Sequence, residues 1–160
     1  PISLEEPMLS ETYAETWAEI LNCAVISYCE TDHSLRTFSL YINFYMQVEI
    51  VHSIFQANKI LSRYNLSFQT LREKKIKWNQ ETHVFEYHIL KTILLFSFDS
   101  FIVWCNKHNG NNLLPFKKDN LRSFCDLMIK CYESPDFHRK IKKIMKRTNG
   151  NSLRMSIIDM

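Results

Sequence analysis

The stretch Ile89–Cys105 reads ILKTILLFSFDSFIVWC, and it is almost entirely apolar apart from Lys91 and Asp99. A bilayer-spanning helix needs about 20 apolar residues, so this shorter run with its two charges is a poor transmembrane candidate. A helix that is surrounded by other helices is also apolar on every face. We therefore expect no membrane span, and a buried central helix over residues 82–106.

The sequence on either side of this run has apolar residues at helical spacing. The first helix is marked by Trp17, Ile20, Leu21, Ala24, Val25 and Tyr28. Thirty residues from Leu35 to Tyr64 continue the pattern, as one long helix or as two joined by a kink. The motif Ser134-Pro135-Asp136 indicates a helix start, with a capping serine, proline at the first position and an acid in the first turn. We predict an all-α, single-domain bundle of about six helices, with an extended arm (1–8), a helical domain (9–147) and a C-terminal tail (148–160).

Glycine is nearly absent, since only Gly110 and Gly150 occur in 160 residues. Sandwiches and barrels need glycine in their turns. Dinucleotide sites and P-loops need it where the backbone approaches phosphate. The composition therefore excludes these folds and sites, and it favours helices joined by short polar loops.

The cysteines are odd in number and lie in apolar, helix-like stretches, at positions 23, 29, 105, 125 and 131. This pattern is typical of buried free thiols rather than of a disulfide framework. The chain also shows no secretory signal pattern. We expect a reducing compartment, either the nucleus or the cytoplasm.

The residues with catalytic or metal-binding chemistry do not form a recognisable site. Cys105 and His108 make one tight pair, but Cys125 and Cys131 are too widely spaced for the usual zinc motif. Asp99 is the one acid placed inside an apolar run, where we expect it to be buried and paired with a lysine or tyrosine. We predict a protein that is not an enzyme and that holds no metal or cofactor.

Charge is distributed unevenly along the chain. Residues 1–50 contain eight acids and one base, whereas residues 51–160 contain nineteen bases and nine acids. The candidate residues for binding an anionic partner are Arg139, Lys140, Lys142, Lys143, Lys146 and Arg147. Nucleic acid is one such partner. The alternative is a solvated helix face whose lysines neutralise the acidic N-terminal helix within the fold.

Aromatic residues are abundant, at 13% of the chain. Around residues 38–55 they fall on more than one face of the expected helix, so some are available to a partner. The candidate partner-binding residues are Phe38, Tyr41, Phe44, Tyr45 and Val48. The alternative is a core that uses bulky aromatic residues where other proteins use leucine.

In length, expected helix content and a composition rich in Asn, Ile and Tyr, the chain resembles small viral Bcl-2-like proteins, although their Asn-Trp-Gly-Arg groove motif is absent. That resemblance implies an inhibitor of a host factor. The chain is also compatible with helical docking domains of chromosomal proteins, such as telomere-protein homology domains. The function we expect is a docking or oligomerisation domain that binds a helix or short peptide in an aromatic-rich groove within a larger intracellular complex.

Overall fold

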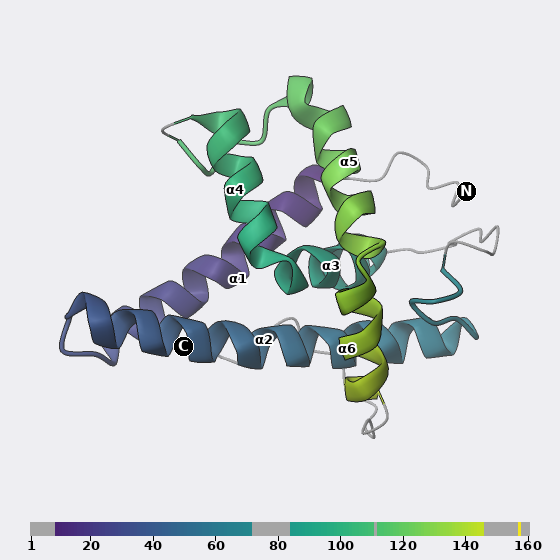
Figure 1. Cartoon of the computed structure of the whole chain (residues 1–160), viewed down its shortest axis with the longest axis horizontal. Coiled ribbons are helices and arrows are strands. Elements are labelled where there is room, and N and C mark those ends of the chain that lie inside the picture. Colours follow the sequence, from purple (N-terminus) through teal and green to yellow (C-terminus); the bar gives the residue numbers. More distant parts are fainter. Residues whose placement is uncertain (1–8, 72–83, 111, 146–156, 158–160) are drawn as a thin grey trace.

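The computed structural model describes residues 9–71, 84–110, 112–145 and 157, and within them it is all-α, as predicted. This part of the chain contains six α-helices, which are labelled in Figure 1. They are α1 (Leu9–Cys29), α2 (Leu35–Arg63), α3 (Lys91–Phe96), α4 (Phe98–Asn109), α5 (Leu121–Tyr132) and α6 (Pro135–Met145). A π-helical turn (η1, Phe85–Leu90) precedes α3, and a 3₁₀ turn (η2, Lys118–Asn120) precedes α5. The predicted arm, and the predicted tail apart from Ile157, lie outside the described residues.

The first two helices form a hairpin that is closed by a tight turn. His33 has a positive φ of 61°, which reverses the chain after α1. Ser34 then caps α2, because its side chain accepts a hydrogen bond from the Thr37 amide at 3.2 Å. The Asp32 carboxylate accepts from the Ser34 amide at 3.1 Å. Beyond this cap, α2 is a single helix of 29 residues.

The prediction of one continuous central helix is wrong at Ser97. The chain bends there by 89°, so that α3 and α4 are separate helices. Both halves of the stretch are apolar on all faces, and hydrophobic spacing therefore contains no sign of the break. The bend lets the two halves bury against different neighbours: Phe96 meets Phe137 of α6, whereas Phe101 meets Trp17 of α1.

The core surrounds α3, which packs against α1, α2, α4 and α5 (Figure 1). Residues Lys91–Leu95 are all buried. On one side of the bend, the ring of Tyr13 lies 5.3–5.7 Å from the rings of Phe101, Phe116 and Phe124. Such edge-on and tilted ring pairs add to the free energy gained from burial.

In the described part of the chain, no single helix is long and apolar enough to cross a bilayer. The segments Tyr87–Phe96 and Phe98–Asn109 reach that length and apolarity only together, across the bend. The predicted start of the last helix at Ser134-Pro135-Asp136 is confirmed, because α6 begins at Pro135.

Candidate interaction surface

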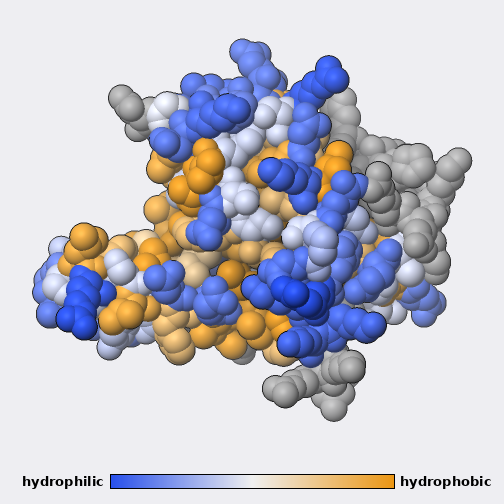
Figure 2. All heavy atoms as spheres, in the orientation of Figure 1, coloured by the Kyte–Doolittle hydropathy of each residue, from blue (hydrophilic) through white to orange (hydrophobic). Residues whose placement is uncertain are grey.

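The α1–α2 hairpin projects beyond the other helices. Figure 1 shows the C-terminal half of α1 and the N-terminal half of α2 extending together past α3, α4, α5 and α6. Figure 2 shows apolar side chains on the surface of this projection. Apolar side chains that gather on such a surface mark candidate binding sites.

The projecting half of α2 exposes a line of apolar side chains. Leu40, Tyr41 and Phe44 are 62%, 41% and 62% exposed. The residues that follow them on the same face, at steps of three and four, are half-buried. We call this line the outer α2 stripe, and it consists of Tyr41, Phe44, Val48, Val51 and Phe55. It lies on the side of the helix opposite to the buried residues Met46 and Ala57.

The five predicted partner-binding residues divide between two faces of α2. Tyr41, Phe44 and Val48 belong to the outer α2 stripe. Tyr45 turns toward α1, where its hydroxyl donates a hydrogen bond to the Glu30 carboxylate. Phe38 is half-buried on the same side of the helix as Tyr45. The outer α2 stripe therefore contains three of the five predicted residues, and the ring of Tyr45 lies beside those of Tyr41 and Phe44.

A second exposed line runs along α1, and the sequence reasoning did not identify it as a surface. Leu21, Val25 and Tyr28 are 45%, 45% and 56% exposed, and Ala14 and Ala18 continue the line toward the N-terminus. We call these five residues the outer α1 stripe. The signal was present in the sequence, because α1 carries two apolar lines and a helix needs only one to join a core.

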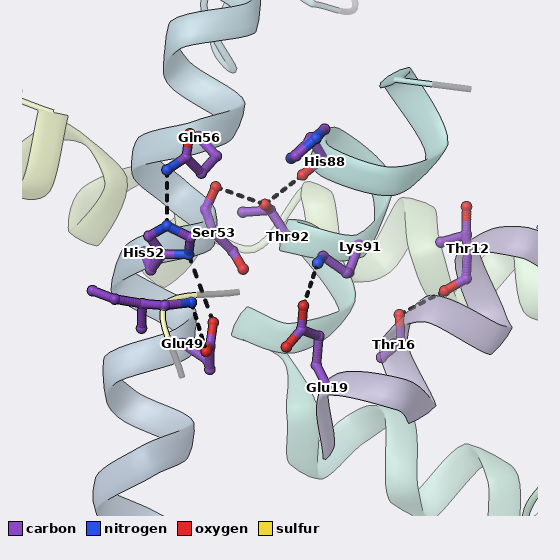
Figure 3. A network of polar contacts seen from close by, with 11 residues as sticks. Thr12, Thr16, Glu19, Glu49, His52, Ser53, Gln56, His88, Lys91 and Thr92 are labelled. Carbon is purple, nitrogen blue, oxygen red and sulfur yellow. Dashed lines mark hydrogen bonds and ion pairs between the residues drawn. The ribbon is translucent and has the colours of Figure 1, made fainter. Parts of the chain in front are cut away.

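Opposite these outer faces, a buried polar network fixes the hairpin to α3 (Figure 3). The Lys91 ammonium lies 2.7 Å from a carboxylate oxygen of Glu19, with both side chains almost fully buried. Burial raises the pKa of Glu19, and the charge of Lys91 opposes that rise. This ion pair joins α3 to α1.

Thr92 makes the corresponding link between α3 and α2. Its hydroxyl lies 3.1 Å from the carbonyl oxygen of Ser53 and 2.5 Å from that of His88, so one hydroxyl serves two backbone acceptors. Burial, and then the nearby positive charge of Lys91, lowers the pKa of His88 to about 4. His88 is therefore neutral at neutral pH.

The network continues along α2 through Glu49, His52 and Gln56 (Figure 3). The Gln56 amide nitrogen lies 2.8 Å from His52 Nε2 and donates to it, which leaves the imidazole proton on Nδ1. His52 Nδ1 lies 3.7 Å from Glu49 Oε2. The other oxygen of Glu49 accepts from the amide of Ile157 at 3.0 Å.

This cluster contains acids, imidazoles and an amine, the groups used in acid–base catalysis. Its side chains are between 0% and 8% exposed, and they are Glu19, Glu49, His52, His88 and Lys91. A solute reaches none of them unless the core opens. The arrangement instead holds α1, α2 and α3 in fixed positions.

The side chains of the closely spaced pair Cys105 and His108 point in different directions. The Sγ atom of Cys105 lies 3.3 Å from the hydroxyl of Tyr13 in the core. The imidazole of His108 stacks on Trp104, and its Nε2 lies 3.1 Å from the Ser123 hydroxyl. Within the described residues, no group of three or more His, Cys, Asp or Glu side chains is arranged to hold a metal ion.

The five cysteines are free, and four of them have a raised pKa. Burial is the main cause in each case, and for Cys23 it raises the pKa to about 12. A thiol of this kind is a poor nucleophile at neutral pH because little thiolate forms. Cys29, at the end of α1, is the exposed cysteine.

The expectation that Asp99 is buried is wrong. Asp99 is exposed in the first turn of α4, where a carboxylate interacts favourably with the helix dipole. The acids that enter the core are Glu19 and Glu49. Two of the eight acids in residues 1–50 therefore lie inside the fold.

The basic helix α6 presents its charges outward. Phe137 and Ile141 are buried, whereas Arg139, Lys140, Lys142 and Lys143 are exposed. Arg139 and Lys140 both pair with Asp136 on the same helix. The other two predicted anion-binding residues, Lys146 and Arg147, lie outside the described residues.

A shallow, open hollow lies between α5 and α6, away from the hairpin. Ile129, Lys130, Glu133 and Pro135 are among the residues that line it. No family model, no curated protein and no solved structure matches this chain.

Proposed function

We propose that this domain is a non-enzymatic docking module that packs an amphipathic helix of a partner protein along the outer α2 stripe. The observation that carries the proposal is the spacing of that stripe. Tyr41, Phe44, Val48, Val51 and Phe55 recur at alternating steps of three and four residues. This is the repeat by which two helices pack side by side.

The exposed rings supply the anchors of this surface. Tyr41 and Phe44 stand at its open end, and aromatic side chains often dominate the binding energy of an interface. The ring of Tyr45, tied to Glu30, contacts the ring of Phe44 at 5.5 Å and that of Tyr41 at 6.2 Å. Both anchors are therefore partly ordered before a partner binds, which lowers the entropic cost of association.

The surroundings of the stripe define the chemistry of the partner. Between Leu35 and Val48 the only charged residue is Arg36. The neighbouring exposed side chains, Asn43 and Gln47, are polar and uncharged. The partner helix should therefore present an apolar line with uncharged flanks, and its binding should depend weakly on salt.

The inner half of α2 provides a rigid base for this surface, because the buried network fixes it to α3. Buried free thiols at Cys23, Cys105 and Cys131 support a reducing compartment for the module, either the nucleus or the cytoplasm.

The substitution Phe44→Glu tests the proposal, with Val103→Glu as the matched control. Both residues are exposed and apolar, and Val103 lies on α4. Tagged wild-type protein and the two variants would be compared by affinity purification and mass spectrometry. A protein captured by the wild type and by Val103→Glu but lost with Phe44→Glu would identify the partner.

A synthetic helix from that partner then completes the test. We expect Phe44→Glu to weaken its binding about 30-fold or more, the size of effect typical of a hot spot. Equal capture of the same proteins by all three forms would refute the proposal.

The exposed bases of α6 favour a second candidate function, binding of a nucleic acid. Arg139, Lys142 and Lys143 project from the face opposite to the buried Phe137, and Lys140 lies beside Phe137 with its ammonium 5.3 Å from the ring centre of Phe96. The variant Lys142→Glu/Lys143→Glu leaves the Asp136 pairs intact and should abolish a salt-sensitive shift of DNA or RNA. If wild-type protein gives no shift at low salt, this candidate is excluded.

A further inference from the structure

The outer α1 stripe is a separate apolar surface that the proposed α2 docking site does not use. Its central residues Ala18, Leu21, Val25 and Tyr28 follow one another at steps of three, four and three. Residues at this spacing form one narrow line along a helix, suited to contact with a second helix. The buried residues Cys23 and Ile26 lie on other sides of α1 and face the core.

The line has its smallest side chain at one end and its largest at the other. Ala18 is the smallest, Leu21 and Val25 are intermediate, and Tyr28 is the largest. If a second α1 packs against the first in the antiparallel direction, Tyr28 of each copy faces Ala18 of the other. Leu21 of each copy then faces Val25 of the other. Large side chains meet small ones, which is how well-packed layers interdigitate.

We propose that the partner of the outer α1 stripe is the same stripe of a second copy of this chain. The two copies pack antiparallel about a twofold axis that passes at the level of Cys23 along the helix. A twofold interface requires a surface that is complementary to itself. The size gradient of this stripe satisfies that requirement in the antiparallel direction.

The charges beside the stripe agree with such a pairing. Asn22 and Ala24 flank the axis, and both are uncharged. The charged residue along the flank of α1, Glu15, comes within about 3 Å of Cys29 of the other copy along the helix axis, given ~1.5 Å per residue. No like charges therefore face each other at the centre of the contact, where their repulsion would oppose self-association.

The pairing would also change how the domain docks a partner. It would place two outer α2 stripes on one particle, so a partner with two helices would bind with increased avidity. The two surfaces lie on different helices, and the failure of one proposal leaves the other intact.

The oligomeric state of the full chain tests the inference. Sedimentation equilibrium over a concentration series that reaches about 1 mM should show wild-type protein forming dimers. Val25→Glu should remain monomeric at every concentration, because two buried glutamates would face apolar side chains across the axis. Val103→Glu and Phe44→Glu should still form dimers, and circular dichroism should show all variants folded.

Three results would overturn the inference. They are a wild-type protein that is monomeric throughout, a dimer that Val25→Glu leaves intact, and a dimer that Phe44→Glu dissociates. The last would move self-association to the outer α2 stripe.

A cross-link tests the direction of the pairing. In the antiparallel arrangement the two Cys29 residues are about 18 Å apart along the axis, given ~1.5 Å per residue. A short thiol-to-thiol linker should therefore not join them in the wild type. In Glu15→Cys it should join position 15 of one copy to Cys29 of the other, as identified by peptide mapping. Links between two residues at position 15, or between two at position 29, would contradict the antiparallel pairing.

Discussion

The two halves of α2 differ in how many of their side chains are buried. From Leu35 to Val48 a single residue, Met46, is buried, and the rings of Tyr41 and Phe44 are exposed to solvent. From Glu49 to Leu61 ten residues are buried, and five of them are polar or charged. Those five are Glu49, His52, Ser53, Gln56 and Asn58.

The difference shows that burial along this helix is decided by the neighbouring helices and not by the polarity of each residue. The inner half has α1, α3, η1 or α6 around it, and some of its polar groups form hydrogen bonds with them or with each other. Among the described helices, α1 is the one that lies beside the outer half (Figure 1). Four predictions test this comparison, from the largest expected effect to the smallest.

The first prediction concerns the ion pair that holds the inner side of the hairpin. Lys91→Met should lower the free energy of unfolding by about 3–5 kcal/mol, because it leaves Glu19 buried without its cation. Guanidinium denaturation monitored by circular dichroism measures this loss. The double variant Glu19→Gln/Lys91→Met should recover most of it, since neither charge then remains. A loss below about 1 kcal/mol would show that the pair is solvated.

The second prediction compares the two halves of α2 directly. Ile54→Ala removes a fully buried side chain and should cost roughly 2–5 kcal/mol of stability. Leu40→Ala, in the outer half, should change the stability by no more than about 0.5 kcal/mol. Equal losses in denaturant unfolding would mean that the outer half is buried as well.

The third prediction uses pH to probe the inner network. The pKa of His88 falls from its ordinary 6.5 to about 4 in the folded protein. The stability that the neutral imidazole contributes is complete above pH 6.5, and it is lost as the pH falls through about 4. Over that range the loss is about 3 kcal/mol at most, from ~1.4 kcal/mol per pKa unit.

The variant His88→Gln isolates this contribution. The difference in unfolding free energy between wild type and His88→Gln should decrease from pH 6.5 to pH 4. Glu19 acts in the opposite sense, because burial raises its pKa and the stability it contributes is lost as the pH rises. Its contribution cancels in the difference. A difference that stays constant with pH would place His88 in contact with water.

The fourth prediction concerns the two cysteines of α1 and involves no change in stability. Cys29 is exposed near the tip of the hairpin, whereas Cys23 is fully buried. A thiol-alkylating reagent should label Cys29 within minutes and should label Cys23 only after denaturation. Mass spectrometry of digested peptides gives both rates. Rapid labelling of Cys23 in native protein would indicate that α1 separates from the core.

Several features of the fold were predictable from local sequence signals. The end of α1 and the limits of α2 follow from apolar spacing and from the polar turn between the two helices. The start of α6 follows from a serine, a proline and an acid in order. These signals work because they depend on residues within one or two helical turns.

The features that were missed depend on contacts between distant residues. The bend at Ser97 occurs where the sequence before and after it is apolar, so hydrophobic periodicity does not indicate it. Glu19 is buried because Lys91 arrives from 72 residues away. The outer α1 stripe resembles core sequence because no local signal tells which of two apolar lines a neighbour covers.

The length of α2 gives the hairpin a mechanical property. At about 1.5 Å per residue, the 14 residues from Leu35 to Val48 form a rod about 20 Å long whose far end is anchored in the core. A tilt of about 5° at that anchor displaces the tip by roughly 2 Å. A load applied at Tyr41 or Phe44 therefore acts as a torque on Glu49, His52 and Gln56. The projecting helix is a lever whose fulcrum is the most polar part of the core.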